Sequence, residues 1–380
     1  MTLSKLILLS ISVFFLLTST VGLALVLQLQ LGVLGAPPYI ITISELLYWL
    51  ALLAAAPLWG KLSDHIGKPK VLLFTSLCSS LLLVMFTFAS TIPSLLLLRG
   101  LHSLAVAGFH PTASAWVSEL STEDIRARRI AVYNQGFSFG IAVGSFLGGW
   151  LLDRFGYRHT YSVLAIFSLI CTALSYTMRS TEGYTSIPSN HIQRRPFTSS
   201  LLILYLSTLL RKSAVIGVLS LVYVYMRKYF GYSPTLIGRL AALNPLTQIA
   251  LMLTAGIFAD KVGRKMALML GFVTSCLAPI TFIYATSWCE FALGFIFIGI
   301  SFAFYISGAL AFIGDVTPTG KAGEYMGYFQ SAQGIGGMIG PFVAGILAHN
   351  YGYATFFWGM EAFTLIALML SLLLPGRPTK

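Results

Sequence analysis

Two short charged stretches, residues 60–70 and 256–265, stand out in a chain of 380 residues of which only 9% are charged. Each has the form G-x-x-x-D-x-x-G followed by a basic residue, and each comes after a long apolar run. Asp64 and Asp260 supply the acid in the two stretches. A carboxylate at the border of a low-dielectric region is stabilised by a base or by a helix N-terminus, so we expect both acids to lie beside such a group.

We expect each charged stretch to be the turn of a two-helix hairpin. Gly60 and Gly67 would permit the sharp reversal, because glycine tolerates backbone conformations that other residues avoid. Lys68 and Lys70 would hold the first turn at an anionic membrane surface. The simplest interpretation of both stretches is therefore a topological anchor.

Ionisable and polar side chains within the apolar runs are further candidates, because charged groups inside a bilayer are costly and are rarely found there without a function. The residues that could line a substrate or proton pathway are Glu45, Arg99, His102, His110, Asn134, Gln135, Arg239, Asn244, Gln330 and Glu361. The sequence does not show which of them face inward.

Arg99 and two histidines illustrate the alternatives. Arg99 either extends outward to the membrane surface or faces a central cavity, and His102 follows on the same helical face. His110 precedes Pro111 and either carries a proton, because histidine titrates near neutral pH, or is a hydrogen-bonded core residue. Two histidines without a third ligand make a poor metal site, so we expect no metal.

Acids near the ends of the runs suggest gates. Glu45 and Arg239 lie near equivalent positions of two runs, and their pairing would close an outer gate. Glu119 and Asp315 end two other runs beside basic residues, and we expect them to form salt bridges across an inner gate.

Two rows of glycines predict close helix packing, since small residues at every fourth position let a neighbouring helix approach. The rows are Gly136, Gly140, Gly144 and Gly148 in one run and Gly336 and Gly340, followed by Pro341, in another. The first row is also a surface along which two halves of the protein could slide. We expect Pro341 to kink its helix.

The runs that carry these residues are long and apolar. Hydrophobic residues make up 57% of the chain, more than a soluble fold can cover with so few charges. A bilayer takes about 20 apolar residues per helix and leaves no water to pair backbone groups, so we predict an all-α membrane protein with about twelve spans. The predicted spans are 3–28, 38–59, 71–90, 94–118, 131–152, 158–178, 201–226, 234–258, 266–286, 290–313, 326–348 and 354–374.

The basic residues indicate the orientation of these spans. With the N-terminus inside, most of the 24 Lys and Arg residues fall at cytoplasmic ends or loops. Topology thus explains the formal net charge of +12 better than nucleic-acid binding does. We expect a multi-pass protein of the cell (inner or plasma) membrane with both termini cytoplasmic and a cytoplasmic linker at residues 179–200.

One constant offset relates the two halves of the chain. Gly60 and Gly256 lie 196 residues apart, and the same offset takes Asp64 to Asp260 and Glu119 to Asp315. It also matches glycines throughout both halves without a gap, which indicates a duplicated six-helix bundle. We therefore predict an N-terminal bundle at 1–178 and a C-terminal bundle at 201–380, arranged as parallel repeats.

Other classes lack their motifs. The sequence contains no H-E-x-x-H or G-x-S-x-G for a membrane enzyme and no G-x-x-x-x-G-K-[ST] for an ATP-driven pump. The four cysteines have no paired spacing and are expected to be small apolar packing residues. We expect no enzymatic activity and no cofactor.

The two charged stretches resemble the first signature of the major facilitator superfamily, G-x-L-a-D-r-x-G-r-k, and the likeness covers essentially the whole chain. Arg99-Gly100 resembles the start of the second signature, and the glycine row from Gly136 resembles that of the twelve-helix drug–proton antiporter branch. His65 and Pro69 depart from the first signature, and Ser145 replaces a proline of the glycine-rich one.

The resemblance implies two six-helix bundles that rock about a central site. It also implies a conformational latch at the charged turns, formed by Gly60, Asp64, Gly67, Lys68, Gly256, Asp260, Gly263 and Arg264. The implied function is a secondary transporter, with export of drug-like or amphipathic compounds preferred and protons as the coupling ion. The antiporter branch often carries an acid in the first helix, and residues 6–30 contain none, so coupling would use Glu45, His110 or Glu361. A sugar or metabolite carrier, a facilitator and a transport-dead sensor stay open, as does the oligomeric state.

Overall fold

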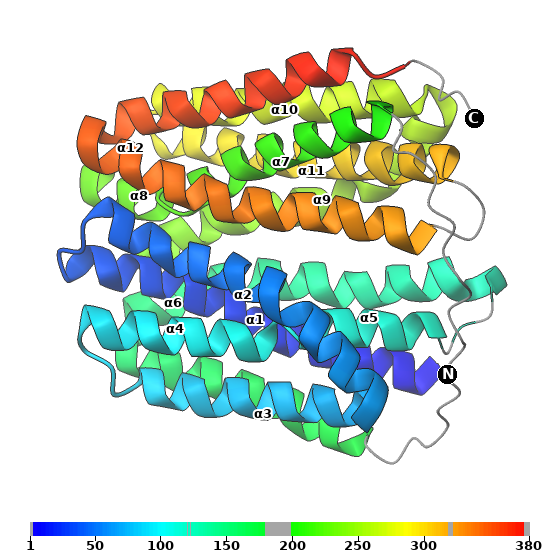
Figure 1. Cartoon of the computed structure of the whole chain (residues 1–380). Helices are drawn as coiled ribbons and strands as arrows, with labels where there is room; N and C mark the ends of the chain where they lie inside the picture. The colour runs from blue at the N-terminus through cyan, green and yellow to red at the C-terminus, as the bar shows by residue number, and fades with distance from the viewer. Residues whose placement is uncertain (1–2, 120, 122, 179–198, 318–321, 376–380) are drawn as a thin grey trace. The chain divides into compact units, whose positions relative to one another are not determined.

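The structure is a computed structural model that describes residues 3–119, 121, 123–178, 199–317 and 322–375. Every regular element within this part of the chain is a helix (Figure 1). The helices are α1 (Leu3–Val33), α2 (Pro38–Ile66), α3 (Lys68–Phe86), α4 (Ile92–Val106), α5 (Phe109–Glu119), α6 (Glu123–Thr177), α7 (Ser199–Leu219), α8 (Val222–Phe230), α9 (Pro234–Lys261), α10 (Arg264–Ile283), α11 (Trp288–Val316) and α12 (Ala322–Leu372). The predicted linker, 179–200, lies outside the described residues except for its last two positions.

The described residues hold ten helical stretches that are long and apolar enough to cross a membrane. Two of these stretches, Arg129–Thr177 in α6 and Glu324–Leu372 in α12, have 49 residues each. At about 1.5 Å per residue, each is roughly twice as long as the hydrocarbon core is thick. Gly156 (φ 72°) and Gly352 (φ 83°) interrupt the two helices, at the places where the sequence predicts a break between spans. Each long helix thus consists of two segments.

The described part of the chain belongs to two compact units. Unit 1 consists of residues 1–34, 47–195 and 232–239, and unit 2 consists of residues 35–46, 196–231 and 240–380. This division follows the predicted repeat with one exception. Residues 35–46, around the start of α2, belong to unit 2, and residues 232–239, around the start of α9, belong to unit 1. The local reason lies in two glycines: Gly149 lies against Gly238 within unit 1, and Gly345 lies against Tyr39 within unit 2.

Each unit has its own apolar core. In unit 1, α1 and α3 both pack against α6, and the core includes Phe109, Trp116 and Tyr133. In unit 2, α7 runs along α12 and α10 packs against α11 and α12, around Phe272 and Phe312. The pairs correspond under the offset of 196 residues, so the two cores repeat one arrangement.

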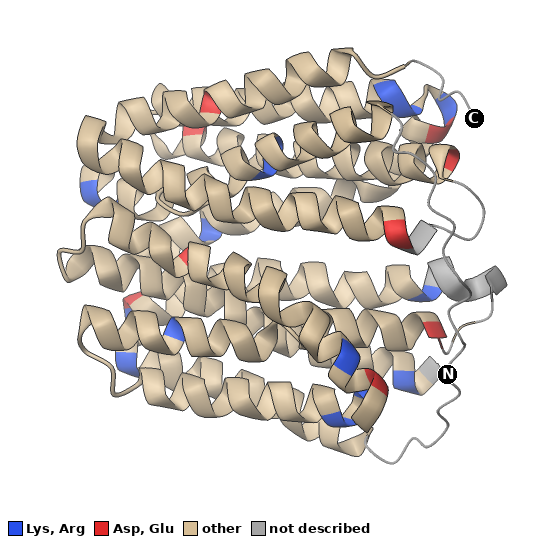
Figure 2. Ribbon diagram, in the orientation of Figure 1, with Lys and Arg blue, Asp and Glu red and all other residues tan. Residues whose placement is uncertain are grey.

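The helix starts repeat as well. Thr91 begins α4 with a capping box in which its side chain and that of Ser94 each bond the other's backbone N–H. Ser287 and Glu290 form the same box at the start of α11, 196 residues later. Such boxes pair backbone donors that a helix terminus otherwise leaves unpaired. Figure 2 shows that the positions of charged residues gather mainly toward the ends of helices, as a bilayer requires.

Candidate functional site

Lys68 is the centre of a charged cluster at one end of unit 1, which we call the Lys68 cluster. Its side chain is 2% exposed, and its ammonium Nζ lies 2.7 Å from Glu119 Oε1 and 3.4 Å from Asp64 Oδ1. Gly67, with φ 97°, turns the chain between α2 and α3 and leaves Lys68 as the first residue of α3. The lysine therefore joins the end of α2 to the end of α5.

Arg264 forms the same cluster in unit 2, which we call the Arg264 cluster. Its guanidinium Nη1 lies 3.0 Å from Asp260 Oδ1, and its Nε donates to Asp315 Oδ2 at 3.1 Å. Nη1 also donates to the backbone oxygen of Ala259, which caps a carbonyl near the end of α9. Gly263, with φ 129°, turns the chain before it. The two clusters repeat each other residue for residue.

Two expectations about these clusters were wrong. Gly60 and Gly256 lie inside α2 and α9, where nothing stands within 4 Å of an added Cβ, so the reversals depend on Gly67 and Gly263. The helices continue through Asp64 and Asp260, so each charged stretch is a helix end followed by a short turn, Gly67 in the first stretch and Val262-Gly263 in the second. Their helical conformation places each acid one turn before its base.

The acids Glu119 and Asp315 have partners within their own units. Glu119 binds Lys68 of unit 1, and Asp315 binds Arg264 of unit 2. We expected salt bridges across an inner gate, and the structure instead gives intra-unit pairs. Together with Asp64 or Asp260, each pair holds the ends of three helices of its own unit together.

The glycine rows lie against the first helix of each unit. A Cβ at Gly140 would stand 2.7 Å from the backbone oxygen of Phe14, and one at Gly144 would stand 2.6 Å from that of Thr18. Gly136 and Gly148 continue the row along α1, against Ser10 and Gly22. Because a real Cβ never approaches an oxygen so closely, α1 and α6 can only be this close where α6 has glycine.

In unit 2, Gly336 and Gly340 of α12 lie in the same way against the backbone of Leu209 and Ser213 of α7. Pro341 follows inside α12, whose only residue with non-helical dihedral angles is Gly352. The interruption of this helix is therefore at the glycine.

Arg99 is buried in unit 1 and does not reach the membrane surface, which rules out one of its two expected positions. Its side chain is 1% exposed, and its guanidinium carbon lies 5.2 Å from the centre of the Tyr48 ring. His102, fully buried one turn later, has its Nε2 at 3.0 Å from Ser79 Oγ. Arg99 and His102 thus belong to the packing between α4 and its neighbours.

His110 stands beside Tyr133, with its Nδ1 at 2.9 Å from the phenol oxygen. The two rings are stacked with their centres 5.6 Å apart, and Phe137 packs on the histidine from the same helix as Tyr133. This geometry is that of a hydrogen-bonded core histidine. This pair could not be predicted from the sequence, because the approach of Tyr133 to His110 depends on how their helices pack.

The other pathway candidates do not form one cluster within a unit. Exposed positions are occupied by Asn134, Gln135, Arg239 and Gln330, and half-buried positions by Glu45 and Asn244. Asn244 accepts a hydrogen bond from Gln248 at 2.7 Å. Glu45 belongs to unit 2 and Arg239 to unit 1, so the outer gate pair stays a prediction.

Arg211 of α7 has a partner set that the sequence did not predict. Its Nη2 donates to Ser301 Oγ at 2.8 Å, and its guanidinium carbon lies 4.3 Å from the centre of the Tyr305 ring. Tyr305 in turn donates to Thr208 at 2.9 Å. Serine and tyrosine are common in membrane spans, so nothing in the sequence singled out these contacts.

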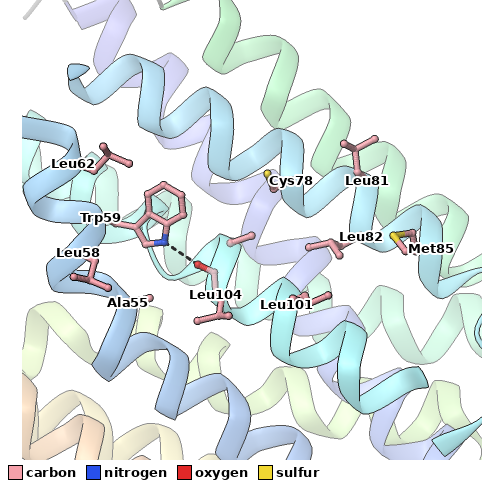
Figure 3. A pocket seen from close by; sticks show the side chains of 11 residues that line it. Ala55, Leu58, Trp59, Leu62, Cys78, Leu81, Leu82, Met85, Leu101 and Leu104 are labelled. Carbon is pink, nitrogen blue, oxygen red and sulfur yellow. Dashed lines mark hydrogen bonds between the residues drawn. The ribbon is translucent and has the colours of Figure 1, made fainter. Parts of the chain in front are cut away.

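An apolar groove of about 630 Å³ lies in unit 1 between α2, α3 and α4. Figure 3 shows Trp59 at one end of it, donating from Nε1 to the backbone oxygen of Leu104 at 2.8 Å. Leu58, Leu81 and Met85 line it and are more than half exposed. The lining includes none of the expected pathway residues, so the groove does not mark the chemistry predicted from the sequence.

Comparison with known families gives a match over nearly the whole chain. Residues 7–223 and 201–380 match the family model described as the Major Facilitator Superfamily.

Among curated proteins, the multidrug resistance protein MdtG of Proteus mirabilis (strain HI4320) is 27% identical over 85% of this chain and 83% of its own length. MdtG of Salmonella schwarzengrund (strain CVM19633) is 24% identical over 80% of this chain and 77% of its own length.

Solved structures share the fold. A mutant of the nucleoside transporter NupG superposes with a TM-score of 0.81 at 15% identity, covering 97% of this chain and 99% of that one. A bacterial homologue of the human lysosomal transporter Spinster, described as inward-facing and occupied, gives 0.79 at 12% identity over 97% and 96%.

Proposed function

Because the chain belongs to the Major Facilitator Superfamily, we propose that it is a secondary transporter that exports small amphipathic, drug-like compounds across a cell membrane in exchange for protons. The observation that carries this proposal is the match, along most of both chains, to proteins named multidrug resistance proteins. The described spans suit such cargo, because they are rich in aromatic side chains and hold few charges.

The repeated charge clusters support a mechanism of alternating access. Two units with separate cores can move as rigid bodies about a site near the middle of the bilayer. The Lys68 and Arg264 clusters would keep the helix ends of each unit in register while the units move. Both termini and both clusters would then face the cytoplasm, as the basic residues indicate.

We further infer that the charged turns act as a latch, in which Asp64 releases its contacts when the inner side opens. Asp64 is suited to this role because its side chain is 69% exposed while Lys68, its partner, is buried.

Asp64→Asn should insert into the membrane normally and transport slowly. The measurement is the transport rate per molecule in vesicles with matched protein levels. Glu324→Gln, which removes a half-buried carboxyl that accepts a hydrogen bond from Tyr328, is the matched control and should transport normally. Wild-type rates for Asp64→Asn would rule out the latch.

The transport proposal is tested with purified protein in proteoliposomes that carry a pH gradient. Ethidium, an amphipathic cation, should accumulate against its gradient, with substrate-dependent proton movement followed by an internal pH dye. A labelled sugar and a labelled nucleoside test the metabolite-carrier alternative in the same vesicles. If only the sugar or the nucleoside moved, and moved independently of protons, the function would be that of a metabolite carrier and not export of amphipathic compounds.

A further inference from the structure

The packing between the third and the sixth predicted spans of each bundle contains a polar seam. In unit 1, Ser168 in the second segment of α6 donates to Ser79 of α3 at 3.0 Å and accepts from Ser80 of α3 at 3.2 Å. Ser80 also lies 3.1 Å from Thr172 Oγ1. Every hydroxyl in this seam is hydrogen-bonded, as buried polar groups in a membrane require.

The offset of 196 residues carries this seam into unit 2. Ser79, Ser80 and Ser168 correspond to Ser275, Cys276 and Thr364. The Cys276 side chain in α10 is buried, and Thr364 Oγ1, in the second segment of α12, donates to the backbone oxygen of Glu361 at 2.8 Å. Unit 2 thus has polar side chains at the matching positions, but the hydrogen bonds differ, since Ser275 Oγ has no partner among the described residues.

One position makes the second seam different. Glu361 stands where unit 1 has Ala165. The Glu361 side chain is 1% exposed, and Oε2 accepts a hydrogen bond from Thr364 Oγ1 at 3.2 Å. Its other oxygen, Oε1, has no hydrogen-bond partner among the described residues, and no base there lies within ion-pair distance.

Most charged groups of the surrounding helices have partners elsewhere or stand at helix ends, and Lys212, which lies inside α7, makes no ion pair with Glu361. On α7, Arg211 donates to Ser301 and covers the Tyr305 ring, and Lys212 follows it. On α11, Glu290 caps the helix start and Asp315 binds Arg264. On α8, Arg227 and Lys228 are exposed. On α10, Arg264 binds Asp315, Lys265 donates to the backbone oxygen of Leu372, and Cys276 is buried.

An ionised carboxylate in such a place would be very costly, because neither water nor a cation offsets its loss of hydration. A protonated carboxyl avoids most of that cost. Glu361 would ionise only when the seam between α10 and α12 opens to water. A carboxyl that gains and loses a proton as its helices move is what proton coupling requires.

We propose that Glu361 is the proton-binding group of this transporter, protonated in the state seen here and releasing its proton when the seam opens. The step consists of one proton binding to the carboxylate and later leaving it. The role of Glu361 in coupling rests on the proposed function, whereas its protonated state can be tested independently of transport.

Infrared spectroscopy of the purified full chain in lipid tests that state directly. A protonated carboxyl has a carbonyl stretch that an ionised carboxylate lacks. The spectrum of wild type minus that of Glu361→Gln should contain this band at neutral pH, and its absence would overturn the proposal. Glu324→Gln, which removes a half-buried, hydrogen-bonded carboxyl from the same helix, should give no such band.

Transport by the same variants tests the coupling. Glu361→Gln replaces the carboxyl by a neutral amide of equal size, so it should fold and keep wild-type exchange of ethidium without a pH gradient. Its gradient-driven accumulation and proton movement should fall to the level of protein-free vesicles, and Glu361→Asp should restore part of both. Proton movement retained in Glu361→Gln, or exchange lost together with it, would refute the role in coupling. Failure of wild type to move ethidium would instead count against the proposed function.

Discussion

At the scale of single residues, the buried ammonium of Lys68 makes the strongest prediction. Glu119→Gln would remove the nearer of the two carboxylates described beside that charge, at 2.7 Å, and leave Asp64 at 3.4 Å. Because Glu119 is half exposed, we expect a moderate loss of about 1–2 kcal/mol in stability, discounted for solvent screening. The midpoint of thermal aggregation in detergent, measured by size-exclusion chromatography, should fall accordingly.

The double variant Lys68→Met/Glu119→Gln provides the control for that prediction. Once the ammonium is gone, loss of the carboxylate leaves no buried charge without a partner, so the two changes together should cost less than their sum. Additive losses would mean that the ion pair contributes nothing of its own. The sequence predicted which residues take part, because acid and base types repeat at one offset. It did not predict that Glu119 binds the base of its own unit, since that depends on how three helix ends meet.

At the scale of helices, the glycine row of α12 fixes how closely α7 can approach. Gly340→Ala would place a methyl group against the backbone oxygen of Ser213, and the two helices would have to separate. Gly327→Ala, in the same helix, has nothing within 4 Å of the new methyl group. We expect Gly340→Ala to lose about 1–3 kcal/mol of stability through overpacking. Thermal midpoints in detergent should fall for Gly340→Ala and stay at the wild-type value or rise for Gly327→Ala. Equal midpoints would show that the row is not a packing surface.

Spacing in the sequence predicted the helices of this fold well, for physical reasons that particular residues make plain. The runs are apolar enough to require helices, and Gly156 and Gly352 mark where the two longest ones break. Gly60 was misread as part of a turn, because a glycine before an acid looks the same in a helix end as in a loop. Partners such as Ser301 for Arg211 were beyond reach, since they depend on helix rotation and not on spacing.

At the scale of the whole molecule, the exchange of residues 35–46 and 232–239 between the units makes each half of the chain incomplete. In unit 1, Thr235 donates to Asp153, and Gly238 lies with its Cα against Ser145. A chain split within residues 179–198 should therefore yield two fragments that are unstable alone and co-purify when expressed together.

In the second fragment, Gly238→Leu should abolish co-purification, because its Cβ would stand 2.7 Å from the Ser145 oxygen. Gly256→Leu lies in the same helix, has open space around it and should have no effect. Stable, separately purified fragments would show that the exchanged segments contribute little to the stability of the units. The two bundles would then move as independent rigid bodies.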